Sequence, residues 1–188
     1  MQTAAFLERA WQQLTQGARD SRHPFRYGVL ATLDEDGVDA RTLVLRSANP
    51  GRHELCFHSD LRSAKLSQLR RDPRVCFVAH SLEWQVRAYG RISIQREGIA
   101  VEAAWDSTSA DSKALYGSRE APGAALSAQT DAEPAGEGSE DLAQGRRHFV
   151  LLRLCVDRLD VLQLDRPGHR RARYELIDQA WQGEWCAP

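Results

Sequence analysis

The stretch at residues 27–46, YGVLATLDEDGVDARTLVLR, contains the pattern that decides the fold. Residues 27–33 and 38–46 have strand character, and the DEDG sequence between them supplies the residues of a tight hairpin turn. Five strands of this kind follow one another at short intervals between residues 27 and 94. The helix predicted among them is too short to force a parallel crossover. The sequence therefore predicts an antiparallel sheet that closes into a barrel.

The rest of the chain adds further strands and flanking helices. The other predicted strands span residues 54–58, 74–79, 84–94, 149–156, 159–164, 171–177 and 181–185. Helical patterns predict helices at 3–17, 59–69 and 97–115. Between 120 and 144 acidic residues are mixed with Gly, Ala, Ser and Pro, and no Lys or Arg occurs. We therefore expect a mainly β fold with flanking α-helices and a mobile acidic loop at about 120–145.

Length and composition favour a single domain, 1–188, without a nucleic-acid or membrane partner. The chain has 188 residues, and 25 Lys and Arg residues against 26 Asp and Glu residues leave no net charge that would attract DNA, RNA or an anionic membrane. No apolar stretch approaches the roughly 18 residues that span a bilayer, so the cytoplasm is the expected location. A chain of this length has little interior to enclose a large ligand, so we expect a cofactor at a surface or a subunit boundary.

The four cysteines offer no site of their own. They include no C-x-x-C pair, so we expect neither a metal site nor a thioredoxin-type motif. We expect them to be reduced, mostly buried, small apolar residues.

Two arginines stand at the ends of an otherwise apolar segment, Arg41 and Arg46. A guanidinium group suits a phosphate because its planar fork matches two phosphate oxygens. A spacing of five places the two side chains on opposite faces of an ideal strand, so both reach one ligand only if the ligand wraps the strand or the strand twists. From this segment alone, two strand-end charges in solvent are the simpler interpretation.

Residues 57–65, FHSDLRSAK, end a predicted strand and open a predicted helix. Free backbone N–H groups and the positive end of the helix dipole favour an anion at such a point, and Ser59, Arg62, Ser63 and Lys65 are close by in sequence. The alternative is an ordinary capped helix with a basic, solvated face. Together with the two strand arginines, several cations around one phosphate become the more economical hypothesis.

The segment 83–90, EWQVRAYG, has the alternation of a half-buried strand. Gln85 on its polar face could hydrogen-bond a flat heteroaromatic ring through both its donor and its acceptor, although alone it would be a surface glutamine. Elsewhere the serines lack the G-x-S-x-G motif, and the six His residues include no H-x-x-x-H pair. A phosphate-bearing cofactor with its own reactivity is therefore better supported than hydrolytic chemistry, and we assign no catalytic residue.

These segments resemble the pyridoxamine 5'-phosphate oxidase-like superfamily of FMN-binding split barrels. The superfamily pattern is R-x-[VL]-x-x-[KR], then F-x-[ST]-[DN]-x-x-S-x-K, then Q-[VF]-R-[IVA]-x-G, and it is matched in this order at 41–46, 57–65 and 85–90. The version of the second motif found here is most similar to an oxidase-like, FMN-binding subgroup whose substrate is unassigned. The expected fold is thus an antiparallel split β-barrel.

The resemblance implies a homodimer that holds FMN between its subunits and acts on a small-molecule substrate. The positions that it matches to cofactor contacts are Arg41, Thr42, Leu43, Val44, Arg46, His58, Ser59, Arg62, Ser63, Lys65, Gln85, Gln129, Thr130 and Arg173. Arg62 enters this set as a substitute for the basic residue that the oxidase has at position 64. The implied substrate contacts are Ser118, Arg119 and Arg171.

Departures from the oxidase pattern limit what the resemblance implies about the reaction. Leu162-Gln163 replaces a Trp-Gln pair, and His169-Arg170-Arg171 is the nearest match to an Arg-x-His element that holds the pyridoxal substrate. FMN binding is thus better supported than vitamin B6 oxidation. The leading expectation is an oxidoreductase in which a hydride passes from the substrate to flavin N5 and dioxygen reoxidises the flavin. The alternatives are a reductase that uses NAD(P)H, and a flavin- or haem-binding module without turnover.

Overall fold

The computed structural model describes residues 2–126 and 139–188, which form two compact units. The first unit comprises Met1–Phe57, Asp72–Ser93 and Arg153–Pro188. The second comprises His58–Arg71 and Ile94–Leu152. The expectation of a single domain over 1–188 stays a prediction.

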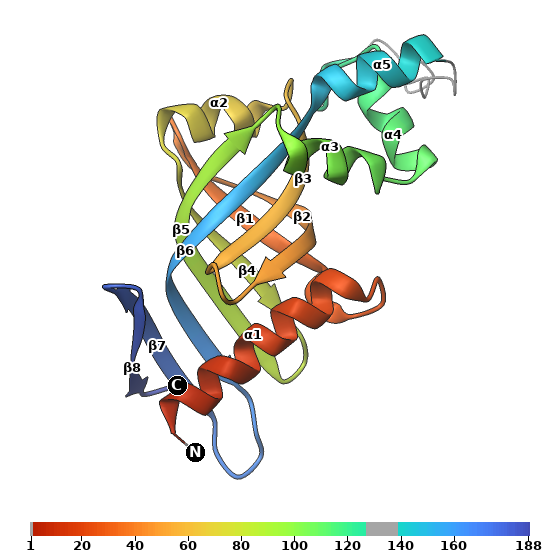
Figure 1. Ribbon diagram of the computed structural model, residues 1–188. Helices are drawn as coiled ribbons and strands as arrows, with labels where there is room; N and C mark the ends of the chain where they lie inside the picture. Colours follow the sequence, from red (N-terminus) through yellow and green to blue (C-terminus); the bar gives the residue numbers. More distant parts are fainter. Residues whose placement is uncertain (1, 127–138) are drawn as a thin grey trace. The chain divides into compact units, whose positions relative to one another are not determined.

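The described strands form one antiparallel sheet that closes on itself (Figure 1). Its closed part runs in the order β3 (Glu54–Asp60), β2 (Gly37–Asn49), β1 (Tyr27–Asp34), β4 (Arg74–His80), β5 (Trp84–Gln95) and β6 (Phe149–Gln163). Strand β6 pairs again with β3, which closes a six-stranded barrel. Strands β7 (Arg170–Ile177) and β8 (Ala180–Cys186) continue the sheet beyond β6. The predicted antiparallel split barrel is confirmed.

The hairpin that decides the fold is present as predicted. The register pairs Asp34 with Gly37, so the turn consists of two residues. Gly37 has a φ of 132°, a conformation that only glycine adopts readily. Along β1 alternate residues are buried, and Leu30 and Thr32 face the interior. The period of two thus places one face of the strand inside the barrel, while Val29 and Leu33 on the other face are exposed.

The N-terminal helix α1 (Thr3–Arg19) packs against the sheet in the first unit. It buries Phe6, Ala10 and Leu14 completely, so the predicted amphipathic helix is confirmed. The ring centroids of Phe6 and Trp84 lie 5.2 Å apart. The hydroxyl of Tyr174 donates to the carbonyl of Thr3 at 2.8 Å, which ties β7 to the start of the helix. A short 3₁₀ turn, η1 (Pro24–Arg26), leads from α1 into β1.

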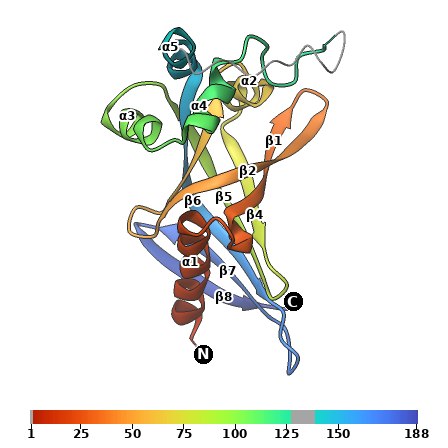
Figure 2. The same ribbon diagram turned by 90° about the vertical axis from the view of Figure 1, so that its right-hand side faces the viewer.

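The second unit contains helices and an aromatic cluster. The helices are α2 (Ala64–Arg71), α3 (Ile99–Asp106), α4 (Ala110–Gly117) and α5 (Ser139–His148). The rings of Trp105 and Tyr116 both meet Phe149 edge to face, with centroids 5.3 and 5.2 Å away. Helices α4 and α5 lie side by side (Figure 2). A Cβ at Gly145 would come within 3.2 Å of the Gly117 nitrogen, so the absence of a side chain allows this approach.

Four expectations about the elements require correction. The helix predicted at 97–115 is two helices, because Ser109 Oγ accepts from Ser112 N and caps a new start. The strands predicted at 149–156 and 159–164 are one strand, whose alternation is broken by two consecutive exposed residues at 157 and 158. The helix predicted from 59 begins at Ala64, because β3 continues to Asp60.

The fourth correction concerns the predicted acidic loop at 120–145. Its last part, from Ser139, belongs to α5, which packs on α4. Residues 127–138 lie outside the described residues, so the remainder of that prediction stays a prediction.

The cysteines differ from the expectation of burial. All four are free thiols, but Cys155 is exposed and the others are only half-buried. In the described part of the chain no helix is long and apolar enough to cross a membrane.

Candidate functional site

Arg41 is anchored within its own sheet in the first unit. Its Nη1 donates to Thr32 Oγ1 at 2.6 Å, and its Nη2 forms an ion pair with Asp39. The register of β1 and β2 pairs Leu30 with Arg41 and Thr32 with Asp39, so these side chains meet on one face. Because Asp39 already balances its charge, an added anion would gain less from Arg41 than from an unpaired arginine.

Arg46 is placed by a β-bulge. Leu45 is paired with Phe57 and Ser47 with Cys56, so Arg46 is the extra residue in the ladder between β2 and β3. Strand alternation alone therefore does not determine where its side chain lies. Within residues 2–126 and 139–188, the buried Nε of Arg46 has no hydrogen-bond partner. A buried guanidinium N–H without an acceptor is costly, and an anionic ligand would satisfy it.

A second arginine, Arg26, lies beside Arg46. Its Nη1 donates to the carbonyl of Leu45 at 3.0 Å, at the bulge, and to the carbonyl of Ala18 at 2.7 Å. Burial, and then the charge of Arg46, lower the pKa of Arg26 below its usual value. The two guanidinium groups thus repel each other, and a phosphate bound there would relieve the repulsion.

The backbone between the two strand arginines is part of the β1–β2 ladder. Thr42 is exposed, and Leu43 and Val44 are half-buried. They pair with Val29, Gly28 and Tyr27. These residues hold the β2 arginines at fixed positions along the strand.

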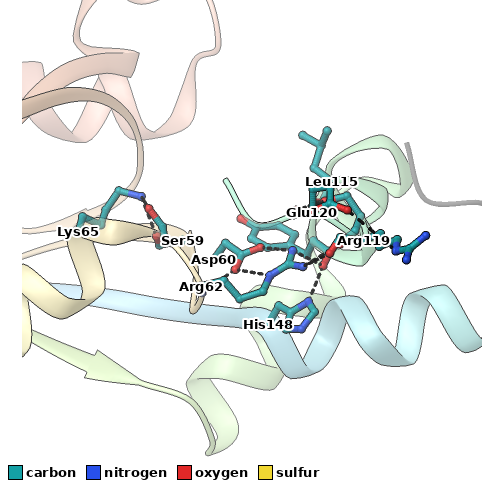
Figure 3. A network of polar contacts seen from close by, with 11 residues as sticks. Ser59, Asp60, Arg62, Lys65, Leu115, Arg119, Glu120 and His148 are labelled. Atoms are coloured by element: carbon teal, nitrogen blue, oxygen red, sulfur yellow. Dashed lines mark hydrogen bonds and ion pairs between the residues drawn. The ribbon is translucent and has the colours of Figure 1, made fainter. Parts of the chain in front are cut away.

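In the second unit, the ammonium group of Lys65 contacts two serine hydroxyls (Figure 3). Its Nζ lies 2.6 Å from Ser63 Oγ and 3.2 Å from Ser59 Oγ. Ser59 is buried in β3, and Lys65 lies in the first turn of α2. An ammonium group with two hydroxyls beside it is a suitable arrangement for phosphate oxygens. The structure therefore brings these three predicted residues together.

Arg62 is close to this group but points to other partners. Its Nε and Nη2 hold both carboxylate oxygens of Asp60, at 3.0 and 2.8 Å. The remaining N–H groups donate to the backbone carbonyls of Tyr116 at 3.3 Å, Ser118 at 2.8 Å and Arg119 at 3.3 Å. A guanidinium has five N–H groups, and all five are used. Arg62 therefore has no N–H group left over for a phosphate, and its expected cofactor contact stays a prediction.

The other predicted residues of the second unit have local contacts. The ring of His58 meets Phe149 edge to face at 4.8 Å. Ser118 Oγ lies within hydrogen-bond distance of the carbonyls of Leu115 and Glu120, at 3.0 and 3.2 Å, and its single O–H is shared between them. The side chain of Arg119 is 96% exposed, so it is accessible to an anionic group.

A buried carboxylate organises the predicted arginines of β7 in the first unit. The side chain of Asp160 on β6 is 7% exposed and accepts from Arg171 Nε at 3.0 Å and Nη2 at 2.9 Å. Arg87 Nη2 donates to it from β5 at 2.7 Å, and Arg173 Nε donates at 3.4 Å. Burial acts to raise the pKa of Asp160, but the bonds from Arg171 and the charge of Arg87 outweigh it, and the pKa is lowered. Asp160 therefore stays ionised among three cations.

This cluster lines a cavity of about 620 Å³. The guanidinium of Arg158 stacks over the Tyr89 ring at 4.0 Å from its centroid, and both line the same cavity. Gln85 precedes Arg87 by two residues, so it lies on the same face of β5. In the described part of the chain, the buried Nε of Arg87 has no hydrogen-bond partner. The cavity thus offers guanidinium donors to an anionic or electron-rich ligand.

The structure groups the predicted residues into two sets, one in each unit. Gln129 and Thr130 lie outside the described residues. Three further residues, Arg26, Asp60 and Asp160, emerge as candidates only from the structure. Of these, Asp60 has a sequence signal, because an Asp two residues before an Arg after a strand permits a local ion pair. The partners of Arg26 and Asp160 come from other strands, which no local spacing reveals.

Comparison with known proteins identifies related chains. The sequence profile of the family described as pyridoxamine 5'-phosphate oxidase matches residues 14–135. A pyridoxamine 5'-phosphate oxidase-related, FMN binding protein from Nostoc punctiforme is 25% identical, with a TM-score of 0.76 over 95% of this chain and 96% of that chain. PhzG from Burkholderia lata, solved with tetrahydrophenazine-1-carboxylic acid, is 21% identical, with a TM-score of 0.75 over 98% and 92% of the two chains. At 21% identity the second likeness shows the fold alone. No curated protein sequence matches this chain.

Proposed function

The chain belongs to the pyridoxamine 5'-phosphate oxidase family, and on that premise we propose that it is a flavoprotein that binds FMN and uses it for oxidoreduction. The Nostoc relative, which covers nearly the whole chain, is an FMN binding protein, and this supports the choice of cofactor. The observation that carries the proposal is the buried Nε of Arg46, which has no partner in the described residues and lies beside the repelling charge of Arg26. A phosphate monoester supplies the acceptor and the negative charge that this arrangement needs.

The second unit supplies an independent set of donors that also fits a phosphate. Lys65 brings a positive charge, and the hydroxyls of Ser59 and Ser63 can each donate a hydrogen bond. Both sets present cationic or hydroxyl donors that suit the binding of an anion. The cofactor contacts that we propose are Arg41, Thr42, Leu43, Val44, Arg46, His58, Ser59, Ser63, Lys65, Gln85, Gln129, Thr130 and Arg173, with Arg26 added and Arg62 left out.

The roles of the remaining residues follow from their chemistry. Bound FMN would supply hydride-transfer chemistry at its N5 atom, with an acceptor such as dioxygen as the oxidant. Gln85 would hydrogen-bond the edge of the ring through its amide. Arg171 would orient an anionic substrate, and Asp160 holds that arginine in one conformation. Ser118 and Arg119 stay proposed substrate contacts.

We further propose a homodimer with the flavin between its subunits and a small-molecule substrate. The filled barrel supports this proposal, since core side chains such as Leu30, Leu45 and Phe77 leave little interior in which to enclose a flavin. A sedimentation measurement of the purified protein with and without FMN tests the dimer. A monomer in both conditions would contradict it. The cytoplasmic location stays a prediction.

The first test of the function is the absorbance spectrum of the purified protein. Flavin bands of the purified protein, or bands that stay with the protein through gel filtration after incubation with FMN, support the proposal, and a Soret band indicates the haem-binding alternative. A colourless protein that takes up no FMN refutes the proposal. Replacing Arg46 with Ala tests the carrying observation, and Arg52→Ala is the matched control, because Arg52 is exposed in the turn between β2 and β3.

The second test identifies the reaction. The FMN-loaded protein is mixed without oxygen with pyridoxamine phosphate, pyridoxine phosphate and NAD(P)H in turn, and flavin bleaching is followed. Bleaching by a pyridoxine compound supports the oxidase proposal. Bleaching by NAD(P)H alone supports the reductase. An absence of bleaching by all three favours a module without turnover.

A further inference from the structure

We infer that Arg62 and Asp60 form a positioning pair that holds the Ser59–Lys65 segment against the end of helix α4, and that this pair sets the affinity for the FMN phosphate without touching it. The inference rests on the proposed function for its ligand, and on the described contacts of the second unit for its geometry. It assigns Arg62 a role other than the phosphate contact expected from the sequence.

The first step of the argument is the use of every donor on Arg62. Two N–H groups go to Asp60 and three to the carbonyls of residues 116, 118 and 119. These carbonyls lie at the C-terminal end of α4, where the last carbonyls of a helix have no partner within the helix. A guanidinium placed there satisfies them and complements the negative end of the helix dipole. Arg62 therefore acts as a cap for α4 that is supplied by a distant segment.

The second step is the position of Asp60 in the segment. Its carboxylate also accepts from the Arg62 backbone N at 2.8 Å, and its carbonyl accepts from Ser63 N at 3.1 Å. Asp60 thus folds the turn that presents Ser63, and it holds the side chain that reaches α4. Asp60 is 7% exposed and Arg62 19%, so the pair is largely shielded from solvent. A shielded pair leaves an uncompensated charge when one member is removed.

The third step is a second tie at the same place. Leu61 N donates to the carbonyl of His148 at 2.7 Å, and His148 Nδ1 lies 2.9 Å from the same Tyr116 carbonyl that accepts from Arg62. The turn at residues 60–63 is thus connected both to the end of α4 and to the end of α5. The residues on each side of it, Ser59 and Lys65, are the proposed phosphate contacts (Figure 3). A change in the pair would therefore displace the phosphate contacts.

The test distinguishes three roles of Arg62, namely positioning, direct phosphate contact and general structural support, by how each variant changes the affinity for flavins. The variants are Arg62→Gln, Asp60→Asn and the double variant, and Arg70→Gln on the exposed side of α2 is the control for lost positive charge. Affinities for FMN and for riboflavin, which lacks the phosphate, are measured by flavin fluorescence. A positioning pair predicts that both single variants weaken FMN on the order of tenfold, as for other residues that orient a ligand-binding group, and leave riboflavin binding unchanged.

The double variant is expected to bind FMN no more weakly than either single variant, because the pair acts as one unit. A direct phosphate contact predicts the opposite sign for Asp60→Asn, since removal of a carboxylate near the phosphate would tighten FMN binding, and this result would overturn the inference. Equal losses for FMN and riboflavin would reduce the pair to a general structural role and would also overturn it.

Amide hydrogen exchange on the protein without FMN completes the test. Both single variants should exchange faster than the wild type and Arg70→Gln at the amides of residues 114–117, because the last turn of α4 opens more often when its carbonyls lose their cap. Unchanged exchange there would overturn the inference even if FMN affinity falls. Failure of the wild type to bind FMN refutes the proposed function, and the exchange result still decides whether Arg62 and Asp60 hold the segment on α4.

Discussion

Replacing Asp160 with Asn should destabilise the first unit. In the wild type the carboxylate accepts four hydrogen bonds from three arginines. Each charge-assisted bond contributes roughly 1.5–3 kcal/mol when shielded. The arginine side chains are 22–52% exposed, so solvent screening reduces these values, and the amide oxygen of Asn keeps part of the bonding. A loss of about 3 kcal/mol in the free energy of unfolding is the expected result.

The assay is urea unfolding at pH 7 and fixed protein concentration, followed by circular dichroism. With a slope of about 2 kcal/mol/M, a loss of about 3 kcal/mol lowers the midpoint by about 1.5 M. Asp157→Asn is the matched control, because Asp157 is exposed on the same strand. If the two variants unfold at the same urea concentration, the arginine cluster is not a stabilising unit and the argument fails.

The pH dependence of the free energy of unfolding tests the same role of Asp160 independently. The pKa of Asp160 is lowered from 3.8 in the folded protein, so its stabilisation is complete above the unfolded pKa and is lost as the pH falls through the folded pKa. The wild type should therefore lose stability below about pH 4 faster than Asp160→Asn does. Parallel stability curves below pH 4 would show that Asp160 is not the group responsible.

Three further changes have expected outcomes. Arg46→Ala should weaken FMN binding by roughly 1.5–3 kcal/mol, about 10- to 150-fold, in a fluorescence titration in which Arg52→Ala binds like the wild type. Gly90→Ala should lower the free energy of unfolding by about 2 kcal/mol or more, because a Cβ there would lie 1.9 Å from the Cys155 carbonyl oxygen. The thermal midpoint should fall accordingly, and an unchanged midpoint would contradict the close approach. Tyr174→Phe should lose about 1 kcal/mol with its hydrogen bond. Burial raises the pKa of that phenol, so its absorbance change on deprotonation should begin at a higher pH than that of the other tyrosines.

The hairpin at 27–46 shows how much of the fold is readable from local patterns. Alternation along both strands and a Gly at 37 suffice, because the turn and the register depend on neighbouring residues. Where the pattern depends on distant packing it fails. The sequence predicts a break at residues 157 and 158, yet β6 is one continuous strand there, because its hydrogen bonds with neighbouring strands continue past these residues. The helix expected at 97–115 contains a serine cap that apolar spacing does not reveal.

The candidate site divides in the same way. The motif at 57–65 contains the three residues that meet at Lys65, because they are separated by only six positions. The sequence shows that Arg62 belongs to this motif, but it does not reveal which groups its side chain contacts, because its carbonyl partners lie 54 to 57 residues away. Asp160 and Arg87 are 73 residues apart, so their pairing requires the register of the closed sheet.

The bulge at Arg46 has a consequence for protein engineering. A bulge is one residue more than the ladder needs, so deleting one residue from 45–47 would restore regular pairing between β2 and β3. The shortened strand would gain hydrogen-bond regularity and lose the extra residue whose guanidinium stands beside Arg26. Selection for thermal stability alone would therefore tend to remove this residue, and a stabilised library of this protein should be screened for retained FMN at every round.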